Sequence, residues 1–257
     1  MKIYVNGCSH TAGTDLSLNY RPQDAWPFRL QEKLGCELVN DSFPGSSNDR
    51  IFRTTVTSIA SDPIPPDLAI IQFTQADRFE LPAVQKPTFQ QILPETYCTL
   101  DEKFLKKTFP IIISNLCKQV FFTSWSNELV HDKMFAYVKA LQEILVAHCI
   151  EYYFVFWWPV DNYIWDKPIA RTVDKTRIVT YNGKDVVPFP KLLKKNNFSL
   201  SDIKRPDGTL DRHYQADAHQ WMADQYCQLI KYGDCELNKH RGTHSKEEWE
   251  NIVNTYD

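Results

Sequence analysis

Short apolar runs alternate with amphipathic stretches over the first 75 residues. KIYVN (2–6), ELVN (37–40) and DLAIIQFT (67–74) predict strands, and the unbroken apolar core of the third is typical of a strand buried on both faces of a parallel sheet. Helices are predicted over 24–34 and after the turn FPGSSN (43–48). This alternation predicts an α/β layered fold with right-handed crossovers, which we interpret as a three-layer α/β/α sandwich with a mainly parallel central sheet.

The ends of these two helices are marked by individual residues. Pro27 suits the first turn of the helix over 24–34, and Gly35 closes it. Ser46, Ser47 or Asn48 is expected to cap the helix that follows the turn.

The middle of the chain is harder to interpret. Prolines interrupt residues 80–130, which predict an irregular excursion over the sheet. Within it, KQVFFTSW (118–125) fits either a strand or a helix, because periodicity does not separate the two. A helix is predicted over 132–148, and YYFVFWW (152–158) predicts another buried strand.

The last hundred residues predict a long loop region over 160–205 with a short basic helix, and then a long helix over 216–231. The chain contains no internal repeat and no low-complexity segment. We therefore expect one domain over 1–237, with the irregular excursion inside it, and a polar C-terminal tail over 238–257.

Composition narrows the class of protein. The 257 residues are 43% hydrophobic and carry a net charge of −3, which gives no general attraction to nucleic acid or anionic membranes. The N-terminal residues lack the profile of a signal peptide, and no apolar run approaches the ~18 residues of a membrane span. We expect a cytoplasmic protein with no nucleic-acid or membrane partner.

Cysteines and histidines give no pattern typical of a metal site. The seven cysteines are scattered without a CxxC pair, which indicates reduced thiols, most of them buried. His219 is expected to be a packed or capping residue, and His240 and His244 lie in the polar tail without a nearby third ligand. No metal and no organic cofactor is expected.

Polar residues follow the predicted strands. They are GCSH (7–10), NDSFPG (40–45), TQADRFE (74–80) and, before the last helix, DRH (211–213). Because ligands bind at the carboxyl ends of the strands in open parallel sheets, we expect these segments to meet at one rim.

Ser9 is the candidate nucleophile of this rim. A serine hydroxyl needs a base and a group that orients the base, and Asp211 and His213 offer both. On a strand-to-helix turn the N–H of Ser9 also faces a developing oxyanion. The alternative is that Ser9 only caps a helix and that Asp211 and His213 are surface residues. Cys8 is expected to pack away from Ser9, and His10 to neighbour the site without being the base.

The segments NGCSHTAG, NDSFPGSSNDRI and DRHYQADAHQWMA together resemble the SGNH (GDSL-like) hydrolases over residues 1 to about 230. The likeness is closer to an uncharacterised branch, common in phage and environmental bacterial genomes, that has G-x-S-H at the start and R-x-E after the third strand. DRFE (77–80) matches the second of these features. The resemblance implies an SGNH-hydrolase or flavodoxin-like fold and a bacterial or phage-infected host cell.

The resemblance also implies roles for single residues. Ser9 resembles the family nucleophile and first oxyanion donor, Gly45 the second donor, His213 the general base and Asp211 its partner. The family's third donor is an asparagine in a G-x-N-D motif, where this chain has QFTQAD. Either Thr74 or Gln75 replaces that asparagine, or the enzyme is weak, or its activity has been lost.

Other side chains at the rim leave two interpretations open. Arg78 and Glu80 form an ion pair that braces the rim, or they contact a substrate. An aromatic cluster is expected from Trp157, Trp158 and Trp165. Either the cluster packs in the core, or one of its rings stacks against a sugar ring.

The function expected from these features is hydrolysis of an ester through a Ser-His-Asp triad, with a small molecule or a glycan as substrate, such as a carbohydrate carrying an O-acetyl group. The alternative is a module of the same fold without turnover, which binds carbohydrate or forms part of a phage particle. The sequence leaves the acyl group and the oligomeric state open.

Overall fold

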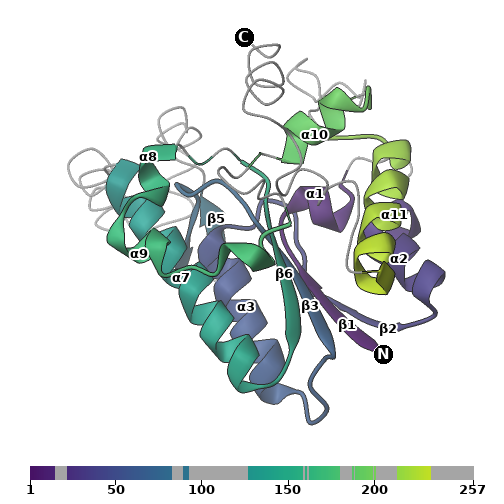
Figure 1. Ribbon diagram of the computed structural model, residues 1–257, viewed down its shortest axis with the longest axis horizontal. Helices are drawn as coiled ribbons and strands as arrows, with labels where there is room; N and C mark the ends of the chain where they lie inside the picture. Colours follow the sequence, from purple (N-terminus) through teal and green to yellow (C-terminus); the bar gives the residue numbers. More distant parts are fainter. Residues whose placement is uncertain are drawn as a thin grey trace.

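A four-stranded parallel sheet forms the centre of the computed structural model (Figure 1). Its strands are β1 (Lys2–Asn6), β2 (Glu37–Asn40), β3 (Leu68–Phe73) and β6 (Glu151–Phe156), in the order β2-β1-β3-β6. The structure describes residues 1–14, 22–82, 89–92, 127–158, 160, 162–179, 187, 189–198, 200 and 213–232.

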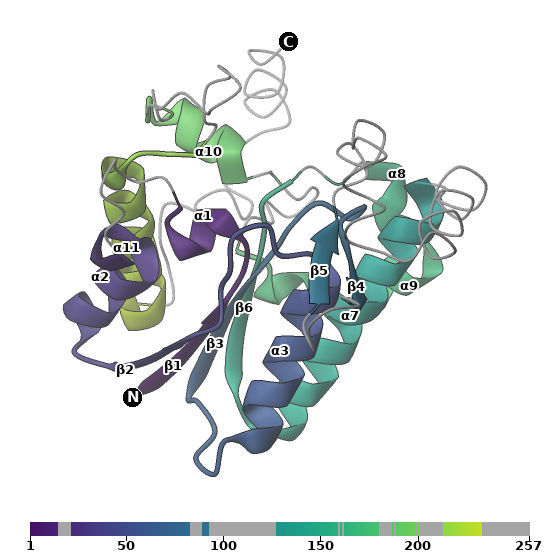
Figure 2. The same cartoon turned by 180° about the vertical axis from the view of Figure 1, so that it is seen from behind.

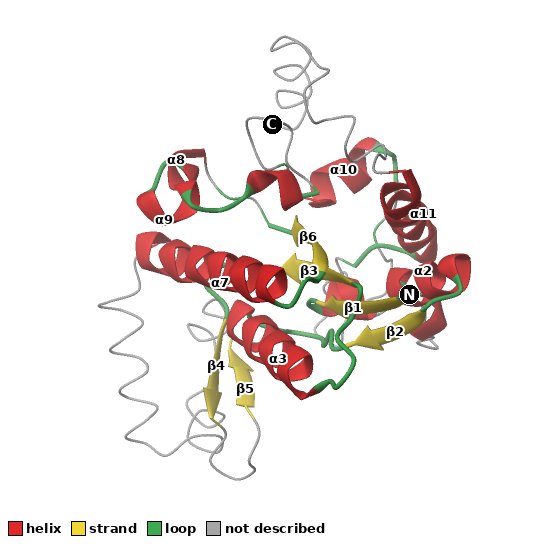
Figure 3. Cartoon of the chain, turned by 60° about the horizontal axis from the view of Figure 1, so that its bottom comes forward, coloured by secondary structure: helices red, strands yellow, loops and turns green. Residues whose placement is uncertain are grey.

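Two pairs of helices cover the two faces of the sheet. On one face α2 (Trp26–Leu34) packs against α11 (Ala216–Tyr232), and on the other α3 (Asn48–Ser61) packs against α7 (Asn127–Ala147). Figure 3 shows the sheet between these pairs. The predicted three-layer α/β/α sandwich with a parallel sheet is confirmed.

Alternation along the strands divides the core into two layers. Ile3 and Val5 of β1 pack with α2 and α11, whereas Tyr4 between them packs with α3 and α7. In β3, Ile70 and Ile71 divide in the same way. Because neighbouring side chains of a strand point to opposite faces, a strand buried on both faces needs the apolar run that the sequence shows.

Shorter elements connect and extend the layers. They are α1 (Ser9–Ala12), η1 (Pro22–Asp24), β4 (Phe79–Pro82), β5 (Phe89–Ile92), α8 (Asn162–Trp165), α9 (Pro168–Arg171), η2 (Lys175–Arg177) and α10 (Phe189–Lys195). Strands β4 and β5 form an antiparallel hairpin, which Figure 2 shows beside α3 and α7.

Most expected helix boundaries agree with the structure. Ser47 caps α3, because its Oγ accepts from the N–H of Arg50 at 3.2 Å. Gly35 ends α2 in the left-handed region, with φ of 59°. Helix α7 begins at Asn127, five residues before the predicted start at 132.

Some predictions lie outside the described residues. Most of the excursion does so, including KQVFFTSW (118–125), and so does the tail over 238–257. The division into one domain and a tail therefore stays a prediction. Within the part of the chain that the structure describes, no helix combines the length and the apolar character needed to cross a membrane.

Candidate active site

The turn from β1 into α1 is closely packed. Gly7 has no room for a side chain, because a Cβ there would lie 2.9 Å from the Cβ of Thr11 and 3.0 Å from that of Gln72. Cys8 is fully buried, and its Sγ accepts from the amide of Gln72 at 3.3 Å. The expectation that Cys8 is a packing residue agrees with this burial.

Ser9 is the first residue of α1 and is partly exposed. The first N–H groups of a helix have no intrahelical acceptor. Among the hydrogen bonds of the described residues, none is donated by the N–H of Ser9. The turn therefore presents a hydroxyl and an unpaired N–H from the same residue.

A second turn lies beside the first. Phe43, Pro44, Gly45 and Ser46 form a turn closed by the N–H of Ser46 on the carbonyl of Phe43 at 3.1 Å, and Gly45 has φ of 74°. Proline at the second position and a glycine of positive φ at the third are typical of a type II turn. The N–H of Phe43 donates to the carbonyl of Gly7 at 3.2 Å, which joins the two turns.

Gly45 also has an unpaired N–H. No hydrogen bond among the described residues uses it. A Cβ at this position would meet no atom within 4 Å, so the requirement for glycine comes from the positive φ and not from lack of space.

The end of β3 is held by Asn48, the first residue of α3. Its Oδ1 accepts from the N–H of Thr74 at 2.9 Å, and its Nδ2 donates to the carbonyls of Thr74 and Gln75, each at 3.2 Å. Asn48 is 1% exposed. This amide thus fixes the backbone of the two residues that stand where the resembled family has its asparagine.

Thr74 and Gln75 differ in how their side chains are held. Thr74 is 2% exposed, and its buried hydroxyl has no hydrogen-bond partner in the part of the chain that the structure describes. The Oε1 of Gln75 accepts from the Nε of Arg78 at 3.0 Å, which fixes the orientation of the Gln75 amide and leaves its Nε2 with no hydrogen bond among the described residues.

Of the two interpretations left open for Arg78 and Glu80, the ion pair between them is wrong, because among the described residues each is bound to another partner. Glu80 receives two hydrogen bonds from Arg53 of α3, at 2.9 and 3.1 Å, and its side chain is 5% exposed. Spacing in the sequence suggested only a pair between residues two apart. The residue that binds Glu80 through two hydrogen bonds, Arg53, lies 27 residues earlier in the chain. Glu80 therefore attaches β4 to α3, and Arg78 contacts Gln75.

Three rings lie in a row at the carboxyl ends of β1 and β6. The imidazole of His10 stacks on Trp157, with ring centroids 4.0 Å apart and an interplanar angle of 18°. The same imidazole contacts the ring of His213, with centroids 4.5 Å apart and an angle of 40°. His213, 9% exposed, therefore lies beside the residue that follows Ser9. Asp211 lies outside the described residues.

Burial controls the charge of His10. Desolvation holds its pKa well below the usual range, and His213, His219 and Arg78 add repulsion in the same direction. His10 is therefore neutral near pH 7. Its Nδ1 is buried and has no hydrogen-bond partner among the residues that the structure describes.

His219 has a structural role. Its Nδ1 accepts from the N–H of Trp26 at 3.1 Å, which satisfies one of the free N–H groups at the start of α2. Burial lowers the pKa of His219 to about 3. The expectation of a packed or capping histidine agrees with this contact.

The predicted tryptophan cluster is divided between two faces of the sheet. Trp157 packs in the layer of α2 and α11, and Trp158 lies partly buried beside that layer. Trp165 packs in the other layer, 4.6 Å from the ring of Phe135. The expectation of one cluster is therefore wrong, because alternation along β6 sends Trp157 to the face opposite the one that Trp165 covers.

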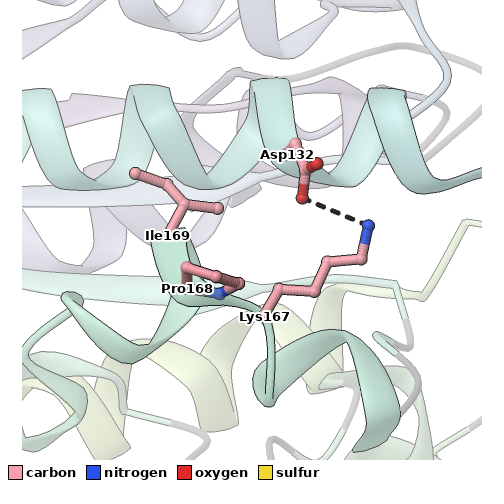
Figure 4. A pocket seen from close by; sticks show the side chains of 4 residues that line it. All are labelled: Asp132, Lys167, Pro168 and Ile169. Carbon is pink, nitrogen blue, oxygen red and sulfur yellow. Dashed lines mark ion pairs between the residues drawn. The ribbon is translucent and has the colours of Figure 1, made fainter.

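A pocket lies apart from these turns, between α7 and α9. Figure 4 shows its lining residues Asp132, Lys167, Pro168 and Ile169. The Nζ of Lys167 faces Asp132 at 3.3 Å, so the two charges at this pocket neutralise each other. None of the predicted site residues lines it. Among the described residues, no group of three or more His, Cys, Asp or Glu side chains could hold a metal ion.

Comparison with known proteins gives a family and distant structural likenesses. A model of a family of unknown function (DUF6071) matches residues 9–232. No curated protein matches the chain.

Three solved structures illustrate the structural likenesses. Esterase EstA from Pseudoalteromonas sp. is 12% identical, with a TM-score of 0.43, over 90% of this chain and 96% of its own. The acetyl xylan esterase AlAXEase is 13% identical, with a TM-score of 0.47, over 90% and 100%. The acetyl xylan esterase Est2A from Butyrivibrio proteoclasticus is 9% identical, with a TM-score of 0.43, over 90% and 64%. Because these TM-scores lie below 0.5, the likenesses carry no argument about what the chain does.

Two contacts at the rim were not predicted from the sequence. The spacing of His10 gives no indication of a ring contact with His213. The sequence indicates Asn48 only as a helix cap, and its bonds to Thr74 depend on a residue 26 positions later. A polar residue directly after a glycine turn and before a helix is the weak signal that could have pointed to it.

Proposed function

The chain belongs to the family of unknown function DUF6071, and we propose that it is a serine hydrolase that cleaves an ester. The proposed nucleophile is Ser9, and the proposed general base is His213. The observation that carries the proposal is the ring contact of His10, the chain neighbour of Ser9, with His213 at 4.5 Å.

That contact joins segments about two hundred residues apart. A serine hydroxyl becomes an effective nucleophile only when a base lies within reach of its proton. His213, three residues before α11, lies against the ring of His10, the residue that follows Ser9, and this position supports its proposed role as the base. Asp211, two residues before His213, is the proposed partner of that imidazole.

The proposed reaction has two stages. In the first, the Oγ of Ser9 forms a bond to the acyl carbon and His213 takes the hydroxyl proton. The bond to the leaving alkoxide then breaks, and His213 gives it the proton. In the second, water attacks the acyl-enzyme with His213 again as base, which releases the carboxylic acid and restores Ser9.

Unpaired N–H groups support this chemistry. The tetrahedral intermediate carries a negative oxygen that needs donors placed in advance. Ser9 and Gly45 each offer a backbone N–H that has no other acceptor among the described residues, and the hydrogen bond from Phe43 to Gly7 holds their two turns together. These two groups are the proposed first and second oxyanion donors.

Gln75 is the proposed third donor, in place of the asparagine that the resembled family has. Arg78 holds the amide oxygen of Gln75, which leaves its nitrogen to donate. The Thr74 side chain is 2% exposed and less suited to reach a substrate. Arg78 is then an orienting residue, and Glu80 supports the rim through Arg53.

Aromatic side chains near the turns suit an organic substrate. Phe43, in the turn that carries Gly45, is 54% exposed, with the guanidinium of Arg50 5.0 Å from its ring centroid. Trp158 lies partly exposed just beyond the end of β6. We propose a small-molecule or glycan ester as substrate, such as an O-acetylated carbohydrate, with no cofactor in the reaction.

Hydrolysis of p-nitrophenyl acetate tests the proposal. The wild type is expected to release p-nitrophenol above the buffer background, and Ser9→Ala to lower the rate by at least about a thousandfold. Ser61→Ala, which changes an exposed serine in the last turn of α3, is the matched control and should keep the wild-type rate.

The alternative is a binding module of the same fold without turnover. It is favoured by the absence of the family asparagine after β3. A folded wild type that does not hydrolyse the ester above background, at the same level as Ser9→Ala, would reject the hydrolase in favour of this module.

A further inference from the structure

We propose that His10 is a positioning residue of the site. Its ring, clamped between Trp157 and His213, sets the orientation of the His213 imidazole and stabilises the protonated form of that imidazole. This inference rests on the proposed role of His213 as general base. It concerns a histidine that takes no part in the proton transfers of the proposed reaction.

Two ring contacts hold the imidazole of His10 in the clamp. Trp157 lies nearly parallel to His10 at 4.0 Å, and His213 lies against His10 at 4.5 Å. Within the described ranges, the buried Nδ1 of His10 has no hydrogen-bond partner. Contact of the ring with its two neighbours therefore fixes the position of this imidazole.

Trp157 is itself immobilised, so it can act as the fixed end of the row. It is 2% exposed, and its ring stacks on Phe189 with centroids 5.5 Å apart. The end of β6 supports it from below, because the N–H of Trp157 donates to the carbonyl of Phe73 at 3.1 Å. A rotation of His213 towards His10 would have to displace this packed layer.

Burial keeps the ring of His10 neutral, and the charges around it act in the same direction. His213 faces it directly, and His219 from α11 and Arg78 from the segment after β3 add to the repulsion of a positive charge. His219 uses its Nδ1 as an acceptor for Trp26, which requires that this nitrogen carry no proton. His10 and His219 are thus unsuited to take a proton, and the proposal assigns it to His213.

A neutral ring beside His213 has an electrostatic effect. The face of an aromatic ring attracts a cation within about 6 Å of its centroid. When His213 takes the proton of Ser9, the face of His10 is in place to stabilise the imidazolium. An aromatic residue without nitrogen offers the same kind of ring face, whereas an aliphatic or amide side chain has none.

The test compares the pH titration of the His213 imidazole, followed by nitrogen-15 NMR, in the wild type and in three variants of His10. His10→Ala and His10→Asn remove the ring, and His10→Phe keeps it. Loss of the ring should move the His213 midpoint down by about 0.5 pH unit, which is about a threefold fall in proton affinity. His10→Phe should restore the wild-type midpoint. His148→Ala, at an exposed position just beyond α7, is the control and should leave it unchanged.

Ester hydrolysis by the same variants gives the second readout. His10→Ala and His10→Asn are expected to lower kcat about tenfold with little change in KM, and His10→Phe to recover most of the loss. Equal effects of His10→Phe and His10→Ala would overturn the proposal, and so would an unchanged midpoint in both ringless variants. If His10→Ala does not fold, His10→Asn and His10→Phe still give the comparison.

The two readouts separate this inference from the proposed function. A protein without ester hydrolysis, in which the His213 midpoint still follows the ring at position 10, would reject the hydrolase and keep the clamp. A hydrolase whose midpoint does not respond to the ring would keep the function and reject the clamp.

Discussion

The side-chain amide of Asn48 is hydrogen-bonded to both backbone groups of Thr74, at 2.9 Å to the N–H and 3.2 Å to the carbonyl. The buried side chain of Asn48 therefore bonds the backbone of Thr74, just after β3, as a residue of a neighbouring strand would. β3 lies between β1 and β6 in the sheet. The contact of Asn48 with Thr74 therefore fixes the position at which the chain leaves the sheet, next to the proposed site.

Asn48→Ala leaves one buried N–H and two carbonyls without their partner. Each such group costs about 1–3 kcal/mol, so we expect the free energy of unfolding to fall by at least about 2 kcal/mol, measured by urea denaturation. Asn196→Ala removes a bond to the carbonyl of Leu192 at an exposed position and should cost less than about 0.5 kcal/mol. Equal losses in the two variants would show that the Asn48 bonds contribute little.

Gly45→Ala separates backbone strain from catalysis when it is compared with Gly35→Ala. Both glycines have positive φ, 74° and 59°, and neither has an atom within 4 Å of an added Cβ. Each substitution should therefore cost about 1–2 kcal/mol in the free energy of unfolding. Only Gly45→Ala should also lower the rate of ester hydrolysis, by about tenfold or more, because it alone shifts a proposed oxyanion donor. Similar rates for the two variants would remove Gly45 from the oxyanion hole.

Gln75→Leu and Thr74→Val distinguish the two candidates for the third donor. Gln75→Leu should lower kcat by about a hundredfold, because it removes the amide that Arg78 orients. Thr74→Val removes a buried hydroxyl that has no partner, so stability should be unchanged or slightly higher and kcat nearly unchanged. The reverse pattern in kcat would assign the donor to Thr74.

His219 makes stability depend on pH. Its pKa is about 3 in the folded protein against 6.5 in the unfolded chain, so the unfolded state binds the extra proton. The stability that neutral His219 provides is complete above pH 6.5 and is lost as the pH falls, by up to about 1.4 kcal/mol per pH unit. His10 contributes with the same sign.

Urea denaturation between pH 7 and about pH 5 checks this. His219→Asn keeps an acceptor for the N–H of Trp26 but does not titrate, and it should flatten the dependence. The exposed His148→Asn should leave the slope as it is in the wild type. A wild-type slope retained by His219→Asn would contradict the assignment.

Local patterns predicted the strands and helix caps because their causes are local. The apolar run of β3 follows from burial on both faces, and the turn at Gly45 follows from proline and glycine at fixed positions. The approach of Gly7, Ser9 and Gly45 to one rim follows from parallel strand order, since the carboxyl ends of parallel strands meet at one edge.

Contacts between distant segments were not predictable in this way. Glu80 pairs with Arg53, and Trp157 and Trp165 lie on opposite faces, because the packing of whole helices decides both.

The most direct test of the account is the mass of the protein after reaction with a fluorophosphonate, followed by peptide mapping of the adduct. A serine activated by a neighbouring imidazole should gain one phosphonyl group at Ser9, and Ser9→Ala and His213→Ala should remain unlabelled. Folded wild-type protein that gains no adduct, or that carries it on another serine, would contradict the claim that Ser9 is the nucleophile of a hydrolase.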